Sequence, residues 1–192
     1  KVLINNYKKS FEGINKIIDN KNIQKFICNV DKNLKLIGIT YTGKVFHLDW
    51  ESNINNDHKL DNKTIGNINP NEIINFHSLK KEIKNYLCIL NSDGRFKKVL
   101  FDKNMINSNR SFAITKLKNN TKTIDSFISN EEKNLIILTS IGRIFKFNLS
   151  DEFLTPTSKQ SQGIIHVKLL PTEKIVSCCP HQNGDNIYLV SK

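Results

Sequence analysis

Basic residues recur in this sequence at a fixed place relative to glycine. Gly43, Gly94 and Gly142 are 51 and 48 residues apart, and each is followed directly by a lysine or an arginine. Further cations follow within four residues of the last two glycines, so that the set comprises Lys44, Arg95, Lys97, Lys98, Arg143 and Lys146. Cations at regular intervals neutralise successive charges of a polyanion without reading its sequence. The spacing therefore predicts a surface that binds a repeating anion.

The overall charge supports the same chemistry. The 192 residues include 29 Lys and Arg and 18 Asp and Glu, which gives a net charge of +11 and a pI near 9.5. This balance favours a nucleic acid or another anionic surface as partner. The alternative is a solvated lysine-rich exterior that reflects the Asn-, Ile- and Lys-rich composition of an AT-rich genome. The matching positions of the cations favour binding.

The glycines lie in the turns of repeated hairpins. Each is preceded by an apolar run and followed by a run that alternates apolar and basic residues, the pattern of a β-hairpin. The copies read LKLIGITYTGKVFHLDWESN from Leu34, YLCILNSDGRFKKVLFDKN from Tyr86 and LIILTSIGRIFKFNLSDEF from Leu135, and IYLVSK from Ile187 begins a fourth. A period near fifty residues indicates an array of similar supersecondary units.

A weaker repeat follows each hairpin. It contains a loop with a basic residue, Gly or Ala before Ile, a pair such as Lys-Leu, and a final strand. Gly13-Ile14 matches Gly163-Ile164, and Ala113-Ile114 with Lys116-Leu117 takes the corresponding place in the middle copy. Residues 51–84 are long and polar, which predicts a surface insertion, with a short helix or turn within residues 71–85.

Four strands per unit predict an all-β fold of four-stranded antiparallel blades around an axis. We expect one repeat body in which residues 1–32 end a blade, residues 33–84, 85–133 and 134–185 form three blades, and residues 186–192 begin a further one. The opening KVLINNYKKS lacks Met and a signal core, so we expect a piece of a longer protein. No apolar run approaches the roughly 18 residues of a membrane span, so no membrane partner is expected.

Catalytic and metal-binding patterns are not found in the sequence. The five histidines, His47, His58, His77, His166 and His181, are scattered, and no glycine loop is suited to cradle a phosphate. We expect no metal site, and we expect Cys28, Cys88, Cys178 and Cys179 to be buried free thiols. The aromatic residues Trp50, Phe96, Phe145 and Phe147 fit core packing better than stacking on bases.

Three segments resemble the C-terminal domain of DNA gyrase A and, to a lesser degree, that of its relative topoisomerase IV. They are ILTSIGRIFKFNLSDEF, SKQSQGI and HVKLLPTEKIVS. The resemblance implies a β-pinwheel, a propeller-like disc whose blades exchange strands and whose basic rim bends duplex DNA to support negative supercoiling. The implied partners are double-stranded DNA, bound with little sequence preference, the rest of gyrase A, and gyrase B.

The resemblance also implies that this chain is not itself an enzyme and holds no cofactor. The parent would be an ATP-dependent type II topoisomerase that uses ATP and Mg²⁺, with its cleavage tyrosine in a preceding domain and ATP hydrolysis on the partner protein. None of the tyrosines here lies in a motif for that nucleophile: Tyr7, Tyr41, Tyr86 and Tyr188.

The predicted DNA contacts combine the hairpin cations with cations of the second half of each unit. They are Lys8, Lys9, Lys44, Arg95, Lys97, Lys98, Arg110, Lys116, Arg143, Lys146, Lys159 and Lys168. Because side chains alternate along a strand, Lys97 and Lys98 cannot face outward in the same way.

One departure from the family leaves two functions open. The family carries a Gln-Arg-Arg-Gly-Gly-Lys-Gly box, whose counterpart here is KQSQGI at residues 159–164, with one cation and one glycine. The chain is expected either to bind and wrap DNA or to bind it without wrapping, and a propeller for protein interaction with an incidentally basic surface is the alternative. The Asn-rich composition favours a plastid such as an apicoplast as the location, with the bacterial cytoplasm as the alternative.

Overall fold

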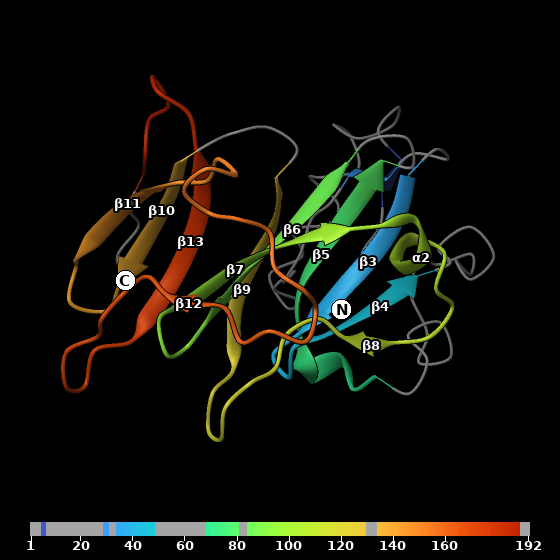
Figure 1. Cartoon of the computed structure of the whole chain (residues 1–192), viewed down its shortest axis with the longest axis horizontal. Coiled ribbons are helices and arrows are strands. Elements are labelled where there is room, and N and C mark those ends of the chain that lie inside the picture. Colours follow the sequence, from blue (N-terminus) through green and yellow to red (C-terminus); the bar gives the residue numbers. More distant parts are fainter. Residues whose placement is uncertain are drawn as a thin grey trace.

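The fold is built from antiparallel sheets that stand side by side (Figure 1). A computed structural model describes residues 5–6, 29–30, 34–48, 68–80, 84–129 and 134–188. Two of its sheets have four strands and one has three, besides a short parallel pair formed by β1 (Asn5–Asn6) and β2 (Asn29–Val30). The predicted all-β class is confirmed. None of the helices in the described residues is long and apolar enough to cross a membrane.

Each sheet is centred on one of the predicted hairpins. The hairpins are β3 (Leu34–Thr40) with β4 (Lys44–Leu48), β6 (Asn85–Asn91) with β7 (Arg95–Phe101), and β10 (Asn134–Thr139) with β11 (Ile144–Asn148). In every turn the glycine N–H donates to the carbonyl oxygen three residues earlier, at 3.0 to 3.1 Å. The glycines have φ of +75° to +80°, a left-handed conformation that glycine adopts without a steric cost.

A third strand from the same unit pairs with the first strand of each hairpin. These inner strands are β5 (Ile73–Lys80), β9 (Thr123–Ser129) and β13 (Ile175–His181). Strand β5 follows a single 3-10 turn, η2 (Pro70–Glu72), so the segment for which a short helix or turn was predicted is mainly a strand. Its pairing with β3 along seven residues overrides the weak helical spacing.

The outer strand of each four-stranded sheet comes from the next unit along the chain. Strand β8 (Phe112–Ala113) pairs with β4, and β12 (Ile164–Ile165) pairs with β7. Between β7 and β8 lies the one-turn helix α2 (Lys103–Ile106), capped by the carboxylate of Asp102. This is the strand exchange that the family resemblance implies.

The outer strands correct one alignment made from the sequence. The N–H groups of Ile114 and His166 donate to the carbonyls of Gly43 and Gly94, at 2.9 and 3.0 Å. Ala113 therefore occupies the place of Ile165, and the prediction that it matches Gly163 is wrong by two residues. A shift of two keeps every side chain on the same face of a strand, which is why the hydrophobic pattern did not reveal it.

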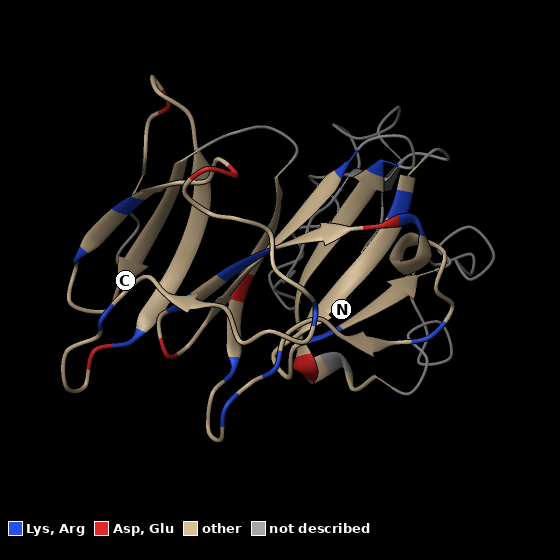
Figure 2. Ribbon diagram, in the orientation of Figure 1, with Lys and Arg blue, Asp and Glu red and all other residues tan. Residues whose placement is uncertain are grey.

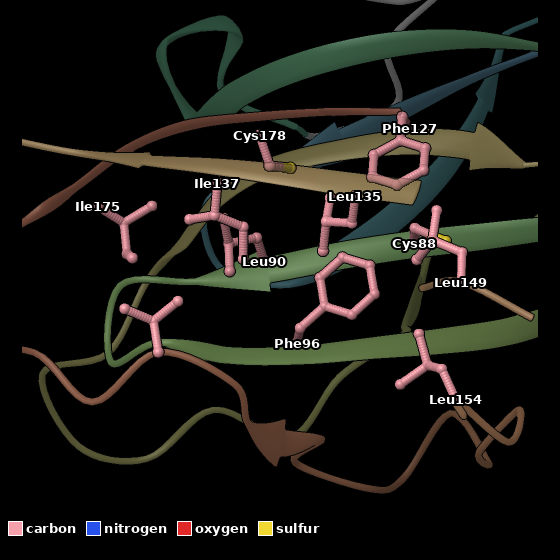
Figure 3. Close-up of a cluster of buried hydrophobic side chains, with 11 residues drawn as sticks. Cys88, Leu90, Phe96, Phe127, Leu135, Ile137, Leu149, Leu154, Ile175 and Cys178 are labelled. Atoms are coloured by element: carbon pink, nitrogen blue, oxygen red, sulfur yellow. The ribbon is translucent and has the colours of Figure 1, made fainter. Parts of the chain in front are cut away.

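The middle sheet is buried on both faces. Leu87 and Ile89 of β6 pack with the first sheet, whereas Cys88 and Leu90 pack with the third. Figure 3 shows the second of these clusters, in which the rings of Phe96 and Phe127 lie among side chains of β10, β13 and the segment after β11. Burying each large apolar side chain contributes about 1.5–3 kcal/mol, so these two clusters hold the sheets together.

The inner strands also meet through a polar group. The carboxylate of Asp125 on β9 accepts hydrogen bonds from Nδ2 of Asn75 on β5 (2.7 Å) and, on β13, from Oγ of Ser177 and N–H of Cys178 (both 2.9 Å). Asn75, Asp125 and Ser177 pair with corresponding residues of the three hairpins, four positions before each turn glycine. The Asp125 side chain therefore connects equivalent positions of the inner strands of all three sheets.

The cysteine prediction is confirmed for two residues and wrong for one. Cys88 and Cys178 are free and buried, and burial raises the pKa of Cys88 to about 12. Cys179 is exposed, because it follows Cys178 on the strand and so projects from the opposite face of the third sheet. Cys28 lies outside the described residues. Among the aromatic residues, Phe96 is fully buried and Phe145 and Phe147 pack partly against the same core, whereas Trp50 is outside the described residues.

Candidate nucleic-acid interface

The predicted cations differ in how far they reach solvent. The exposed ones are Lys44, Arg110, Lys116, Lys146, Lys159 and Lys168, whereas Arg95 and Arg143 are half-buried, and Lys97 and Lys98 are buried. Lys8 and Lys9 lie outside the described residues. The twelve positions chosen from the sequence are therefore not one continuous surface.

Two of the exposed lysines, Lys116 and Lys159, border one hollow where the first and second sheets join, and Lys44 is next to it. Lys44 begins β4 and pairs with Ala113 of β8, whose flanking residues line a shallow hollow. The hollow is bordered by Phe112, Ala113, Thr115, Lys116, Lys159 and Gln160. Nζ of Lys159 lies 5.6 Å from the centre of the Phe112 ring, and the N–H of Lys116 donates to the carbonyl of Ser161 at 3.2 Å. Consecutive units thus contribute Lys44, Lys116 and Lys159 to one place.

A second set of cations occupies equivalent places on neighbouring sheets. Lys116 and Lys168 each lie two residues after the residue whose N–H donates to a turn glycine, and both are exposed. Lys122 and Lys174 are also exposed, and their N–H groups donate to the Oγ atoms of Ser92 and Ser140, at 3.0 Å in both sheets.

The sequence prediction missed Lys122 and Lys174. The signal was available, because both directly precede an inner strand and they are 52 residues apart, which is close to the repeat period. Figure 2 shows basic segments along the lower edge of the molecule, where the hairpin turns and the loops before β9 and β13 lie. This edge therefore carries more repeated positive charge than the predicted set contains.

The two half-buried arginines are held by carboxylates. Nε of Arg95 is 3.0 Å from Oδ2 of Asp93, and its Nη1 donates to the carbonyl of Gly163 at 3.3 Å. The Arg143 guanidinium pairs with both carboxylate oxygens of buried Glu173, with 2.8 Å between Nε and Oε1. The hydrogen bonds from Arg143 lower the pKa of Glu173 to about 2. Arg95 therefore links its own turn to the segment before β12, and Arg143 links its turn to the segment before β13.

The prediction that Lys97 and Lys98 reach DNA is corrected by their burial. Nζ of Lys98 donates to the carbonyl of Leu149 at 2.7 Å, pairs with the carboxylate of Asp151, and lies 4.6 Å from the centre of the Tyr86 ring. Nζ of Lys97 donates to backbone carbonyls on the other face of β7. Alternation along the strand sends each ammonium into one of the two junctions that flank the middle sheet.

Known proteins with a similar sequence or a similar fold were compared with this chain. No family model matches the chain. The chain is 28% identical over 115 residues to the A subunit of DNA topoisomerase 4 from Synechocystis sp., a match that covers 55% of this chain and 12% of that protein.

Two solved structures match over most of the described fold. The C-terminal domain of DNA gyrase A superposes with a TM-score of 0.61 at 19% identity, covering 79% of this chain and 49% of that one. The C-terminal domain of DNA topoisomerase IV superposes with a TM-score of 0.60 at 18% identity, covering 80% and 49%. The chain spans about half the length of these domains, and it has the β-pinwheel fold that they share.

Proposed function

We propose that this chain is a DNA-binding module of a type IIA topoisomerase, and that it bends duplex DNA along its basic edge. The observation that carries the proposal is that Lys116 and Lys159 border one hollow, that Lys44 pairs with Ala113 of the same hollow, and that Lys168 is the exposed equivalent of Lys116 on the next sheet. Ammonium groups from successive units are suited to successive phosphates of one duplex, since phosphate contacts position a protein on DNA without reading bases.

The electrostatics favour binding that depends strongly on salt. The net charge is +11, and within the described residues no carboxylate forms an ion pair with any of the three junction lysines. Each phosphate contact releases condensed counterions and adds about 0.9 to the slope of log K against log salt concentration. Bending the duplex costs several kcal/mol, which contacts on more than one sheet would offset.

The first test compares two triple variants that remove the same charge. K44A/K116A/K159A removes the junction lysines, and K80A/K84A/K103A removes exposed lysines at the strand ends opposite the turns. We expect the junction variant to lower the salt slope for duplex binding by about 2 to 3 and the control to change it by less than 1. Fluorescence anisotropy with a labelled duplex measures both. Equal effects, or duplex binding that does not respond to salt, would favour a protein-interaction propeller instead.

Wrapping needs a separate measurement. If the chain bends DNA around itself, affinity should rise with duplex length, and sealing nicked circles in its presence should shift their linking number. Affinity that rises with length while the linking number stays unchanged would indicate binding without wrapping. The reduced box at residues 159–164 has the single cation Lys159, so the linking-number measurement separates wrapping from plain binding.

We further propose that the parent is an ATP-dependent type II topoisomerase, most closely gyrase, in which ATP, Mg²⁺ and the cleavage tyrosine lie outside this chain. The similarity to the A subunit of a DNA topoisomerase 4 supports the enzyme class. A plastid such as an apicoplast, where the rest of gyrase A would assemble with gyrase B, is the proposed location. Imaging of a tagged parent protein would test this placement.

A further inference from the structure

Lys97 is a buried lysine that the DNA-binding surface does not use. It is the third residue after the turn glycine, and the other two hairpins have phenylalanine there, Phe46 and Phe145. Its side chain is 1% exposed. Because two of the three hairpins form with an apolar residue at this place, the hairpin itself does not require an ammonium group.

The surroundings of the Lys97 ammonium are backbone carbonyls. Nζ donates to the carbonyl oxygens of Ile114 (3.0 Å), Ser158 (2.8 Å) and Ser161 (2.9 Å), and a fourth oxygen, that of Lys159, is 3.5 Å away. A lysine ammonium has three N–H donors, so these three short contacts satisfy it completely. The acceptors come from the end of β8 and from the loop that precedes β12.

We propose that Lys97 is a positioning residue for the junction site, because its ammonium ties the loop of residues 158–161 to the end of β8 and so holds Lys159 beside Lys116. The inference rests on the proposed DNA-binding function, since it assigns the group that organises that site. A charge-assisted hydrogen bond is about twice as strong as a neutral one, and here one ammonium supplies three.

The remaining ties of the loop are weaker or fewer. The N–H of Thr157 donates to the carbonyl of Lys98 at 2.8 Å, and the hydroxyls of Ser161 and Thr157 are 3.0 Å apart. The N–H of Lys116 also donates to the carbonyl of Ser161 at 3.2 Å, whereas the Lys97 ammonium joins both Ser158 and Ser161 to the carbonyl of Ile114. Removing its ammonium would take a charged donor away from the carbonyls of Ile114, Ser158 and Ser161. Ser158 and Ser161 would keep a backbone N–H donor each, so we expect the segment that carries Lys159 to loosen.

The burial of Lys97 makes its charge sensitive to pH. The nearby charged groups are Lys116 and Lys159 on the rim of the hollow, and within the described residues no carboxylate forms an ion pair with Lys97. Burial lowers the pKa of Lys97 to about 8. Above that pH the neutral amine has two N–H donors for three carbonyls, so the loop should loosen.

The test replaces Lys97 with an apolar side chain of similar length, K97M, and uses K98M as the matched control. Both variants remove one buried ammonium of β7, but Lys98 contacts Leu149 and Asp151 instead of the loop. We expect trypsin to cut after Lys159 at least ten times faster in K97M than in the wild type, and less than threefold faster in K98M. Equal acceleration in the two variants would overturn the proposal, because it would show general destabilisation.

A double-mutant cycle measures whether Lys97 acts through Lys159. K97M should weaken duplex binding severalfold, K97M/K159A should bind like K159A alone, and K97M with K168A should show additive losses. Raising the pH from 7 to 9 should weaken binding by the wild type more than by K97M. Additive losses with K159A would overturn the proposal. If the wild type binds no duplex, the proposed function fails, and the trypsin experiment still decides the role of Lys97.

Discussion

The middle and third sheets have the same hairpin in different surroundings. In the middle sheet β12 covers the outer edge, and the turn at Gly94 is so close to the next unit that an added Cβ would lie 2.0 Å from the carbonyl oxygen of Val167. In the third sheet β11 has no outer partner among the described residues, and a Cβ at Gly142 would meet nothing within 4 Å. The following unit therefore decides whether a position of the hairpin is core or surface.

The fourth residue after the turn glycine shows the effect on charge. At this position Lys98 of the middle sheet is buried against Leu149 and Asp151, whereas Lys146 of the third sheet is exposed. Asp151 accepts hydrogen bonds from Lys98 and Tyr86, and the interaction with Lys98 is the main cause of its lowered pKa. A cation at this position belongs to a sheet junction wherever a further unit covers it, so Lys146 is the weakest of the exposed DNA-contact candidates.

The largest expected difference between the two sheets is at their glycines. G94A forces a left-handed residue and a clash with backbone, so we expect it to lower the free energy of unfolding by roughly 3 kcal/mol or more. G142A pays only the conformational cost, about 1 kcal/mol. Urea unfolding of both variants checks this. Equal losses would show that the donated segment does not press on Gly94.

The second comparison is between the equivalent lysines. K98M removes hydrogen bonds from a charged donor inside the junction, and we expect a loss of roughly 2 kcal/mol, since such bonds contribute about 1.5–3 kcal/mol each and Asp151 can be solvated. K146M should change stability by less than about 0.5 kcal/mol, as is usual at exposed positions. Thermal unfolding at pH 7 measures both. A similar loss in K146M would contradict the difference in burial.

The smallest effect concerns the same position in the first sheet, which holds His47. Its ring lies near Phe101 and Phe112, and neither ring nitrogen has a hydrogen-bond partner among the described residues. Burial lowers its pKa from 6.5 to about 4, so the unfolded chain takes up a proton first and stability falls as the pH drops from about 6.5 to 4.

The variant H47F removes this proton uptake. Its stability should match or exceed that of the wild type at pH 7, and the loss on acidification should be smaller by about 1 kcal/mol after allowance for solvent screening. His77, whose pKa burial also lowers to about 4, contributes to the remaining acid sensitivity, as do Asp151 and Glu173, whose pKa values are lowered by hydrogen bonds from Lys98 and Arg143. Melting curves at pH 7 and 4.5 test the comparison, and an unchanged pH dependence in H47F would contradict it.

The hairpins were predictable because their signals are local. Gly43, Gly94 and Gly142 mark turns that require left-handed φ, and the alternation around them defines two strands each. The exposed lysines Lys44 and Lys116 were found through the same repetition. Residues close in sequence set these features, so the sequence pattern identified them without knowledge of the packing.

Other features depend on contacts between units. Lys98 looks in sequence like its exposed counterpart Lys146, and Lys97 looks like a solvated lysine. The loop from residue 157 and the segment from Leu149 to Asp151 bury them. The two-residue error at Ala113 has the same origin, since its place is set by a hydrogen bond to Gly43 in the preceding unit. The repeated sequence pattern does not show which hairpin residues are buried by a neighbouring unit.

The donated outer strands also bear on how the chain folds during synthesis. Strand β4 ends at Leu48 and its partner begins at Phe112, and β7 ends at Phe101 with its partner beginning at Ile164. At roughly 5–20 residues per second, each new hairpin waits about 3 to 13 seconds for the strand that pairs with its outer edge. During that interval the outer edges of β4 and β7 lack their final partner, and a strand edge with unpaired N–H and C=O groups can pair with another chain.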